Sequence, residues 1–344
     1  MKYTAEKYQL TFHSPVLTSR GSMAHKNGYL LKANTSNGFT AVGECSYIEG
    51  LSIDNLPHYA QKIAEVIATL NASNLTDFLL STDFLLLQKE FPSIAFGVEM
   101  LAANLATQQD FLYFPSPFTQ NKLQMPINGL VWMGNKDFML SQIKDKLKNN
   151  FQCIKLKVGA LDFDIELELI KYIRSQFDEK TIELRLDANG AFSPTNAAEK
   201  LHQLAQYHIH SIEQPIKQNQ WAEMATLCQK NIIPIALDEE LIGVNDPKLM
   251  LELLINVKPQ YIILKPSLLG GFKQAEHWIS AAKKQNISWW ATSALESNYG
   301  LNAIAQWVVK FENNLVQGLG TGSLYKDNFD SPLYIKNAKI GYCQ

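Results

Sequence analysis

Ile182-Glu183-Leu184-Arg185-Leu186-Asp187 is the stretch of sequence that decides the fold. Its apolar residues alternate with polar ones, as in a β-strand, and it ends on a carboxylate. Four other short apolar runs also end on a charged residue, and these residues are Lys157, Glu213, Asp238 and Lys265. The five charged residues follow one another at intervals of about 25 to 30 residues, which suits a βα unit. We therefore expect them at the C-terminal ends of five successive parallel strands.

The same spacing runs from residue 126 to residue 318 and predicts an α/β fold, a (β/α)7β modified TIM barrel. The expected strands are 126–131, 152–157, 182–187, 210–213, 233–238, 260–265, 287–292 and 315–318. The expected helices are 136–149, 164–176, 195–207, 220–230, 246–256, 272–285 and 297–310. Two of them carry a start signal in which a capping residue precedes proline, Ser193-Pro194-Thr195 and Asn245-Asp246-Pro247.

The first 120 residues differ from this repeat and predict an α+β capping domain. Residues 3–12 and 28–48 are strand-like, with turn residues between Asn34 and Gly38 that indicate a hairpin. Residues 55–71 and 93–108 have helical apolar spacing. Two prolines at 114–118 indicate a linker, so we expect domains of 1–120 and 121–320, with 321–344 returning to the first.

The composition describes a globular protein and excludes several partners. The chain has 344 residues, 46% of them hydrophobic, and a net charge of −2, so we expect neither nucleic acid nor anionic membrane to attract it. It has no apolar run long enough for a membrane span, and because residues 1–7 lack the apolar core of a signal peptide we expect no secretory signal there. Its four cysteines are widely spaced without a CxxC pair, which favours reduced thiols and a cytoplasmic protein.

Three carboxylates in the expected barrel mouth indicate a metal site. Asp187, Glu213 and Asp238 come from adjacent strands and include no Cys or His. Hard oxygen ligands of this kind suit Mg²⁺, with Mn²⁺ as the alternative. A single carboxylate at a strand end is more often a helix cap, but three at barrel spacing favour a shared cation.

Two lysines flank these carboxylates and predict proton-transfer chemistry. Lys157 and Lys265 are four strands apart, so they are expected on opposite sides of the mouth, where one amine can act as a base. Lys155 precedes Lys157 by two residues and points to the same face at greater depth, so we expect it to act through its charge. A cation beside them would stabilise the negative charge that forms when a proton leaves the carbon next to a carboxylate.

Five motifs together resemble the muconate-lactonizing subgroup of the enolase superfamily. They are Lys155-Leu156-Lys157, Asp187-Ala188-Asn189, Glu213-Gln214-Pro215, Asp238-Glu239 and Lys265-Pro266. The resemblance covers nearly the whole chain and includes Gly43-Glu44-Cys45 in the N-terminal module. Four longer segments resemble the o-succinylbenzoate synthases of menaquinone biosynthesis, namely Ile127–Gly134, Arg185–Phe192, Ser293–Leu301 and Gly318–Gly322.

This resemblance implies a carbon–oxygen lyase acting on a small-molecule carboxylate. The substrate would be 2-succinyl-6-hydroxy-2,4-cyclohexadiene-1-carboxylate, and Mg²⁺-dependent syn loss of water would give 2-succinylbenzoate. Lys157 would take the ring proton and then protonate the departing hydroxide, while Lys265 would stabilise the anionic intermediate. Arg185 and Asn189 would orient the substrate, and Ser293 would hold the succinyl tail.

Two alternatives compete with this interpretation. An N-acylamino-acid racemase or a dipeptide epimerase would need the same metal and both lysines. Dipeptide epimerases usually carry Asp-x-Asp after the last barrel strand, where this chain has Gly320-Thr321-Gly322, so dipeptides are disfavoured and N-succinylamino acids stay open. A non-catalytic barrel used for binding would tolerate the loss of some of the five charged residues, yet all five are present.

Overall fold

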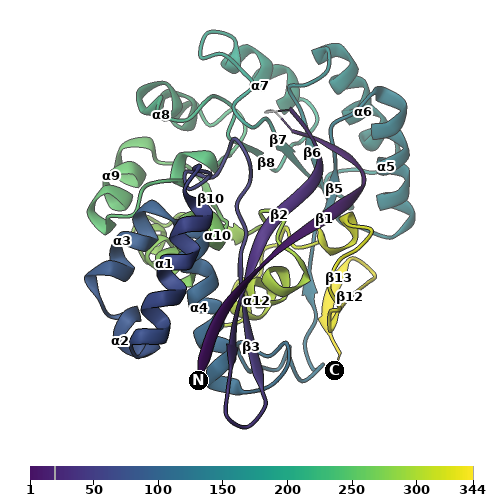
Figure 1. The fold of residues 1–344 in the computed structure, drawn as a ribbon. Coiled ribbons are helices and arrows are strands. Elements are labelled where there is room, and N and C mark those ends of the chain that lie inside the picture. The colour runs from purple at the N-terminus through teal and green to yellow at the C-terminus, as the bar shows by residue number, and fades with distance from the viewer. Residues whose placement is uncertain (19–20, 344) are drawn as a thin grey trace.

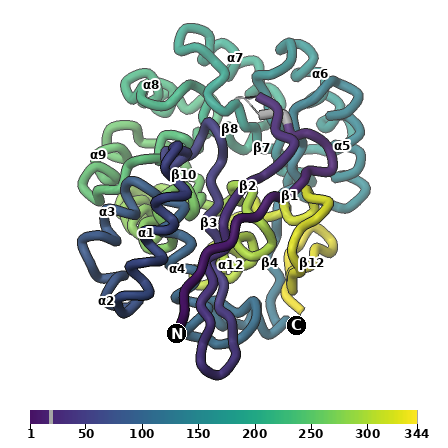
Figure 2. The backbone as a smooth tube through the Cα atoms, in the orientation of Figure 1, coloured from purple at the N-terminus to yellow at the C-terminus, as the bar shows by residue number. Residues whose placement is uncertain are grey.

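The computed structural model describes residues 1–18 and 21–343 and has two main parts. A three-stranded antiparallel sheet with four helices stands beside a curled seven-stranded parallel sheet ringed by helices (Figure 1). Both ends of the chain lie on the same side of the molecule (Figure 2). None of the helices in the described residues is long and apolar enough to cross a membrane.

The N-terminal sheet is a long hairpin with a third strand. It comprises β1 (Lys2–Thr18), β2 (Gly21–Asn34) and β3 (Thr40–Cys45), in the order β1-β2-β3. The predicted hairpin between residues 34 and 38 joins β2 to β3, where Asn34 pairs with Thr40. β1 runs beyond the predicted 3–12, with an irregularity between Thr11 and Val16 that changes its register with β2.

Helices cover one face of this sheet. They are α1 (Tyr59–Ala72), α2 (Leu75–Leu79), α3 (Thr82–Glu90) and α4 (Pro92–Thr107). α1 and α4 match the predicted 55–71 and 93–108, whereas the short α2 and α3 were not predicted. α4 lies against β3 because both carry glycine at the contact: a Cβ on Gly43 would lie 1.9 Å from the carbonyl oxygen of Gly97.

The parallel sheet follows the predicted barrel order. Its strands are β5 (Gly129–Val131), β6 (Cys153–Lys157), β7 (Glu183–Asp187), β8 (Ser211–Glu213), β9 (Ile235–Leu237), β10 (Tyr261–Leu264) and β11 (Ser288–Ala291). They neighbour one another in sequence order, so each βα unit places its strand beside the one before. The expected (β/α)7β architecture is confirmed.

The helices between these strands agree with prediction within about two residues. They are α5 (Lys136–Lys148), α6 (Phe163–Gln176), α7 (Ala197–Ala205), α8 (Trp221–Lys230), α9 (Pro247–Val257), α11 (Phe272–Lys284) and α12 (Asn298–Val308), with a short extra α10 (Pro266–Leu269). Asp246 caps α9 as predicted, its side chain accepting from the backbone N–H of Lys248. The other start signal was wrong, because α7 begins at Ala197 and residues 194–196 form turns.

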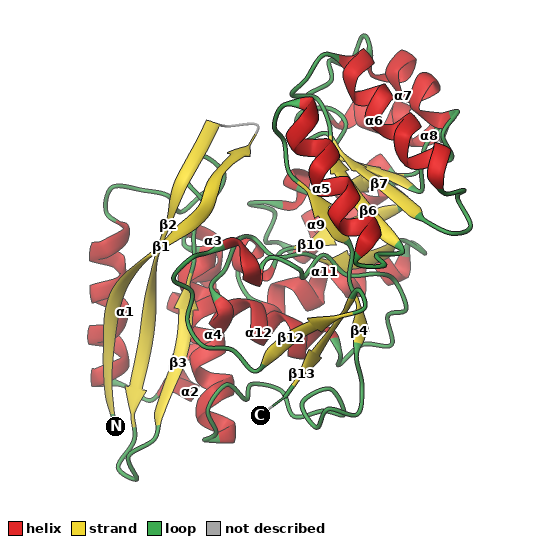
Figure 3. Cartoon of the chain, turned by 90° about the vertical axis from the view of Figure 1, so that its right-hand side faces the viewer, coloured by secondary structure: helices red, strands yellow, loops and turns green. Residues whose placement is uncertain are grey.

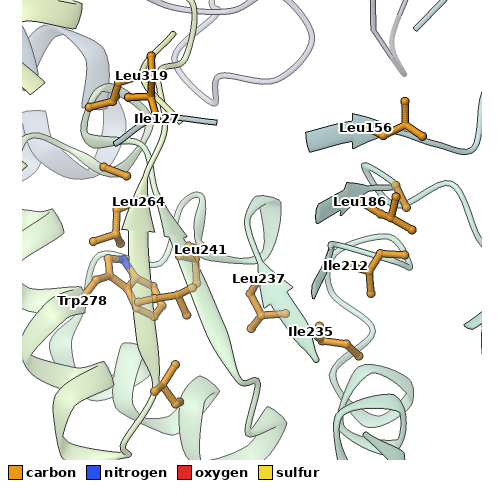
Figure 4. Packing of buried hydrophobic residues seen from close by; sticks show 14 of the residues in the cluster. Ile127, Leu156, Leu186, Ile212, Ile235, Leu237, Leu241, Leu264, Trp278 and Leu319 are labelled. Atoms are coloured by element: carbon orange, nitrogen blue, oxygen red, sulfur yellow. The ribbon is translucent and has the colours of Figure 1, made fainter. Parts of the chain in front are cut away.

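Alternation along each strand separates the core from the barrel mouth. Leu156, Leu186 and Ile212 pair in register and lie one above the other in the hydrophobic core (Figure 4). The odd-numbered residues of the same strands, Lys155 and Arg185 among them, therefore point into the barrel.

The barrel closes more loosely than predicted. The expected strand 126–131 is split, because β4 (Met125–Pro126) leaves the barrel and pairs with the C-terminal hairpin β12 (Leu333–Lys336) and β13 (Lys339–Tyr342) (Figure 3). The expected strand 315–318 is reduced to parallel bridges, Ile127 with Gln317 and Thr292 with Gly318. Two short 3-10 turns, η1 (Glu239–Leu241) and η2 (Gly322–Leu324), complete the elements.

The terminal segment touches both parts of the molecule. Tyr325 forms a bridge with Phe12 of β1, and the N–H of Lys326 donates to the carbonyl of Thr11. β12 pairs with β13, and β13 pairs in turn with β4 at the start of the barrel chain. We propose that residues 1–120 and 121–320 are the two domains and that the segment 321–344 connects them.

Candidate active site

The five predicted charged residues meet in one mouth of the barrel. Lys157, Asp187 and Glu213 are the last residues of β6, β7 and β8, while Asp238 and Lys265 directly follow β9 and β10. Asp187 and Glu213 pair directly in the parallel register of β7 and β8, so their side chains emerge side by side. Each of the three carboxylates is only 2% exposed.

Lysine amines alternate with the carboxylates in this mouth. Lys155 Nζ lies 3.0 Å from Asp187 Oδ2 and 2.5 Å from Glu213 Oε2. Lys157 Nζ lies 2.9 Å from the same Asp187 oxygen, Oδ2. Lys265 forms an ion pair with Asp238, and its Nζ lies 3.9 Å from Glu213 Oε1. Opposite charges thus neutralise one another in a buried site.

The electrostatics of the mouth follow from burial and these pairs. Burial lowers the pKa of Lys155, but Asp187 and Glu213 outweigh it, and the net pKa is raised. Burial likewise lowers the pKa of Lys265, but the neighbouring Asp238 and Glu213 raise it by more, so the net pKa is raised. Burial favours the neutral form of Asp187, yet the three lysines bring its pKa well below the usual range. Burial, and then repulsion from Asp187, raise the pKa of Glu213 to about 8.

The carboxylates fit a divalent cation in chemistry. All their donor atoms are hard oxygens, and Glu213 Oε1 is buried and accepts no hydrogen bond from any described residue. The Lys265 ammonium faces this oxygen from 3.9 Å, too far for a hydrogen bond, so the oxygen keeps the capacity to bind a further cation. In the present arrangement no three His, Cys, Asp or Glu side chains of the described residues come together as an ion-binding group, because the amines stand between the carboxylates. A shared ion stays a prediction.

Other polar side chains hold the mouth in shape. Asn189 accepts a hydrogen bond from Lys157 at 2.5 Å and donates one to Glu239 at 3.0 Å, so it links the base candidate to the far wall. Gln214 Oε1 accepts a hydrogen bond from the backbone N–H of Asp238 at 3.2 Å. Asn189 and Gln214 both have positive φ, 43° and 40°, so the chain turns sharply just after two of the carboxylate strands.

A cavity that is partly open to solvent lies over these residues. Its lining includes Lys155, Lys157, Lys265, Asp187, Asn189 and Ser293, which the sequence predicted. It also includes Trp132, whose ring centre is 5.8 Å from Lys157 Nζ, and the turn of Ile48 and Leu51 from the N-terminal module. Only Trp132 lies in one of the family-like segments, Ile127–Gly134, whereas Ile48 and Leu51 carry no charge or regular spacing that could have marked them.

One side of the cavity carries unpaired polar atoms. Thr292 Oγ1, Thr321 Oγ1 and Asn128 Oδ1 are buried, line the cavity, and find no hydrogen-bond partner among the described residues. The predicted Ser293 lies beside them, although its hydroxyl oxygen already accepts from the N–H of Leu295 at 2.9 Å. This side therefore presents donors and an acceptor to a polar group of a ligand.

Arg185 does not lie where the sequence reasoning placed it. It is 1% exposed and does not line the cavity; its Nε donates to Glu183 at 2.6 Å and its Nη1 to the carbonyl of Val316 at 2.8 Å. The guanidinium also stacks on Trp290 with 4.0 Å to the ring centre. Arg185 faces inward like Asp187 but one layer deeper, so a direct contact with substrate is not supported.

Comparisons with known proteins identify relatives of this chain and of its fold. Residues 139–341 match a family model described as enolase C-terminal domain-like. The chain is 41% identical to the o-succinylbenzoate synthase of Desulfotalea psychrophila over 99% of both chains. The crystal structure of MenC from the same organism superposes with a TM-score of 0.87, at 40% identity and 99% coverage of both. The substrate-liganded L-Ala-D/L-Glu epimerase of Bacillus subtilis shares the fold, with a TM-score of 0.84 at 19% identity, covering 99% of this chain and 96% of its own.

Proposed function

The chain belongs to the enolase superfamily, and from that premise we propose that it is an o-succinylbenzoate synthase. It removes water from 2-succinyl-6-hydroxy-2,4-cyclohexadiene-1-carboxylate and forms 2-succinylbenzoate, a step in menaquinone biosynthesis. The observation that carries this conclusion is the 41% identity to a synthase over 99% of both chains. The mouth of buried amines and carboxylates supplies the groups that such an elimination needs.

Lys157 is proposed as the base and then the acid. Its amine faces the cavity, held between Asp187 and the Asn189 side chain, with the Trp132 ring on a third side. The amine takes the proton from the ring carbon that bears the carboxylate. It then gives that proton to the hydroxyl group leaving the neighbouring carbon, so both events occur on one face of the ring. Loss of water makes the ring aromatic, which favours the products.

Lys265 and Lys155 are proposed to act through their charge. Lys265 enters the cavity from β10, four strands away from Lys157, and pairs with Asp238. A fixed positive charge placed there stabilises negative charge on the ring carboxylate after proton removal. Lys155 lies deeper, between Asp187 and Glu213, and balances the charge of the carboxylates below the substrate.

The family uses a divalent metal, and Mg²⁺ is the proposed ion, with Mn²⁺ as a substitute. Asp187, Glu213 and Asp238 would hold it, because they are hard oxygen donors on adjacent strand ends and one of their oxygens accepts no hydrogen bond from the residues that the structure describes. When bound, the cation supplies positive charge for the carboxylate of the substrate.

The succinyl tail is proposed to bind at the polar side of the cavity. The hydroxyls of Thr292 and Thr321 are free to donate to the tail carboxylate, with Ser293 beside them. Within the described part of the chain these two buried hydroxyls have no hydrogen-bond partner, which supports a site for an acceptor, since an unpaired polar atom there would otherwise cost about 1–3 kcal/mol.

One experiment tests the function directly. The purified protein with Mg²⁺ is given the cyclohexadiene substrate, and the aromatic product is followed by ultraviolet absorbance, with a parallel racemisation assay on N-succinylamino acids. We expect fast product formation that EDTA abolishes and added Mg²⁺ restores. Racemisation without any dehydration would instead support the racemase alternative, which the positions of Lys157 and Lys265 on opposite strands would also serve. Dehydration indifferent to EDTA would contradict the metal site.

A further inference from the structure

A turn of the N-terminal module forms part of the cavity wall. Ile48 and Leu51 line the cavity and pack in the same apolar cluster as Trp132 and Leu295. The turn is closed on itself, because the N–H of Ser52 donates to the carbonyl of Ile48 at 2.9 Å and the Ser52 hydroxyl accepts from the N–H of Ile48 at 2.8 Å. These bonds fix its shape but not its place over the barrel.

Glu44 joins the strand before this turn to the barrel. Its side chain is fully buried and accepts from the N–H of Ser297 at 2.8 Å, the hydroxyl of Ser297 at 2.6 Å and the N–H of Gly300 at 2.8 Å, and also from Tyr8. This carboxylate sits on the N-terminus of α12, where an anion is favoured. The close fit requires glycine, since a Cβ on Gly300 would lie 2.8 Å from Glu44 Oε2.

Lys26 of β2 holds the other side of the same segment. Its amine donates to the carbonyl of Tyr47, the residue just before Ile48, and the side chain is 2% exposed. Burial lowers the pKa of Lys26 to about 8, while the facing carboxylates Glu44, Glu296, Asp54 and Glu49 act against that change. A buried ammonium so placed is otherwise unexplained, because it neither lines the cavity nor lies on the surface.

We infer that Lys26 and Glu44 are positioning residues that set the turn of residues 48–51 over the bound substrate. Glu44 ties the end of β3 to α12, whose preceding residues Ala294 and Leu295 form the adjoining wall of the cavity. Lys26 fixes the backbone carbonyl between Glu44 and the turn. The pair therefore governs how tightly the cavity encloses its ligand rather than the proton transfers. The kinetic part of this inference rests on the proposed function.

The test compares Lys26→Met and Glu44→Gln with matched controls. Lys32→Met changes a lysine of the same strand that pairs with the exposed Glu6, and Glu99→Gln changes a carboxylate that binds the N-terminus of α11 in the same manner. Steady-state kinetics with the cyclohexadiene substrate give KM and kcat, and hydrogen–deuterium exchange is followed in peptides that cover residues 46–52.

We expect Lys26→Met and Glu44→Gln each to raise KM at least tenfold, with kcat within threefold of wild type. Both variants should also speed hydrogen–deuterium exchange in residues 46–52. The controls should leave KM and that exchange unchanged. A purely structural role would lower kcat through loss of folded protein and leave KM alone, which would overturn the inference, as would equal effects in the controls. Should Glu44→Gln fail to fold, Lys26→Met decides. Should the wild type fail to turn over the substrate, the proposed function is wrong. The exchange data alone then decide whether Lys26 and Glu44 position the turn of residues 48–51.

Discussion

Glu99 should make the stability of the folded protein depend on pH. This residue of α4 is buried, and its carboxylate accepts from the backbone N–H groups of Phe272 and Lys273 at the start of α11. Burial raises its pKa from the ordinary 4.5 to about 7, although the two N–H groups oppose the rise. The folded protein therefore binds the Glu99 proton more tightly than the unfolded chain does. The free energy of unfolding must then fall as the pH rises from about 4.5 to about 7.

The Glu99→Gln variant removes this dependence while its amide oxygen can still accept from the same N–H groups. With 1.36 kcal/mol for each pKa unit, the unfolding free energy of the wild type should fall by about 2.5 kcal/mol relative to the variant between pH 5 and pH 8. For a chain of 344 residues, whose unfolding entropy is about 0.7 kcal/mol per kelvin, this is about 3 to 4 °C in Tm.

The assay is thermal unfolding of both proteins at pH 5, 6, 7 and 8. The difference in Tm should move by the stated amount in favour of the variant as pH rises. Glu65→Gln is the control, because Glu65 lies on the surface near Lys62, where a lowered pKa places its titration below this range. A Tm difference that stays constant from pH 5 to pH 8 would refute the reasoning about Glu99.

Three further variants probe the cavity. Lys157→Ala should lower kcat by about 10²–10⁴-fold with an unchanged circular dichroism spectrum, and near wild-type turnover would remove Lys157 as the base. Lys265→Met should lower kcat by about 10²–10³-fold with KM changed much less, as stopped-flow and steady-state rates can establish; an effect confined to KM would assign Lys265 to binding alone. Thr321→Val keeps the shape but loses a hydroxyl donor, so KM should rise about 10- to 100-fold; an unchanged KM would move the tail site elsewhere.

The barrel and its charged residues could be predicted because they repeat. Each βα unit adds a strand beside the previous one, so regular spacing of charged residues at strand ends is enough to bring Lys157, Asp187 and Glu213 together. The first and last strands follow no such rule. β4 lies outside the barrel, where it pairs with β13. The paired residues are more than 200 positions apart, so local sequence does not encode this contact.

The depth of a side chain in the barrel and the residues that form the cavity wall were harder to predict than the face of the strand on which a side chain lies. Alternation correctly turned Arg185 to the inside, but two residues along a strand are about 6.6 Å, enough to move its guanidinium from the cavity to the layer below. The walls formed by Trp132, Ile48 and Leu51 depend on how the N-terminal module docks on the barrel. That docking is fixed by buried contacts such as those of Glu44 with α12, between residues more than 250 positions apart.

Asp187, Glu213 and Asp238 are proposed to share one divalent ion beside Lys157. Isothermal titration of Mn²⁺ or Mg²⁺ into the metal-free protein measures this most directly, together with the Asp187→Asn, Glu213→Gln and Asp238→Asn variants. We predict one ion per chain for the wild type and a loss of at least tenfold in affinity for each variant. Binding that is absent in the wild type, or equally strong in all three variants, would contradict the claim.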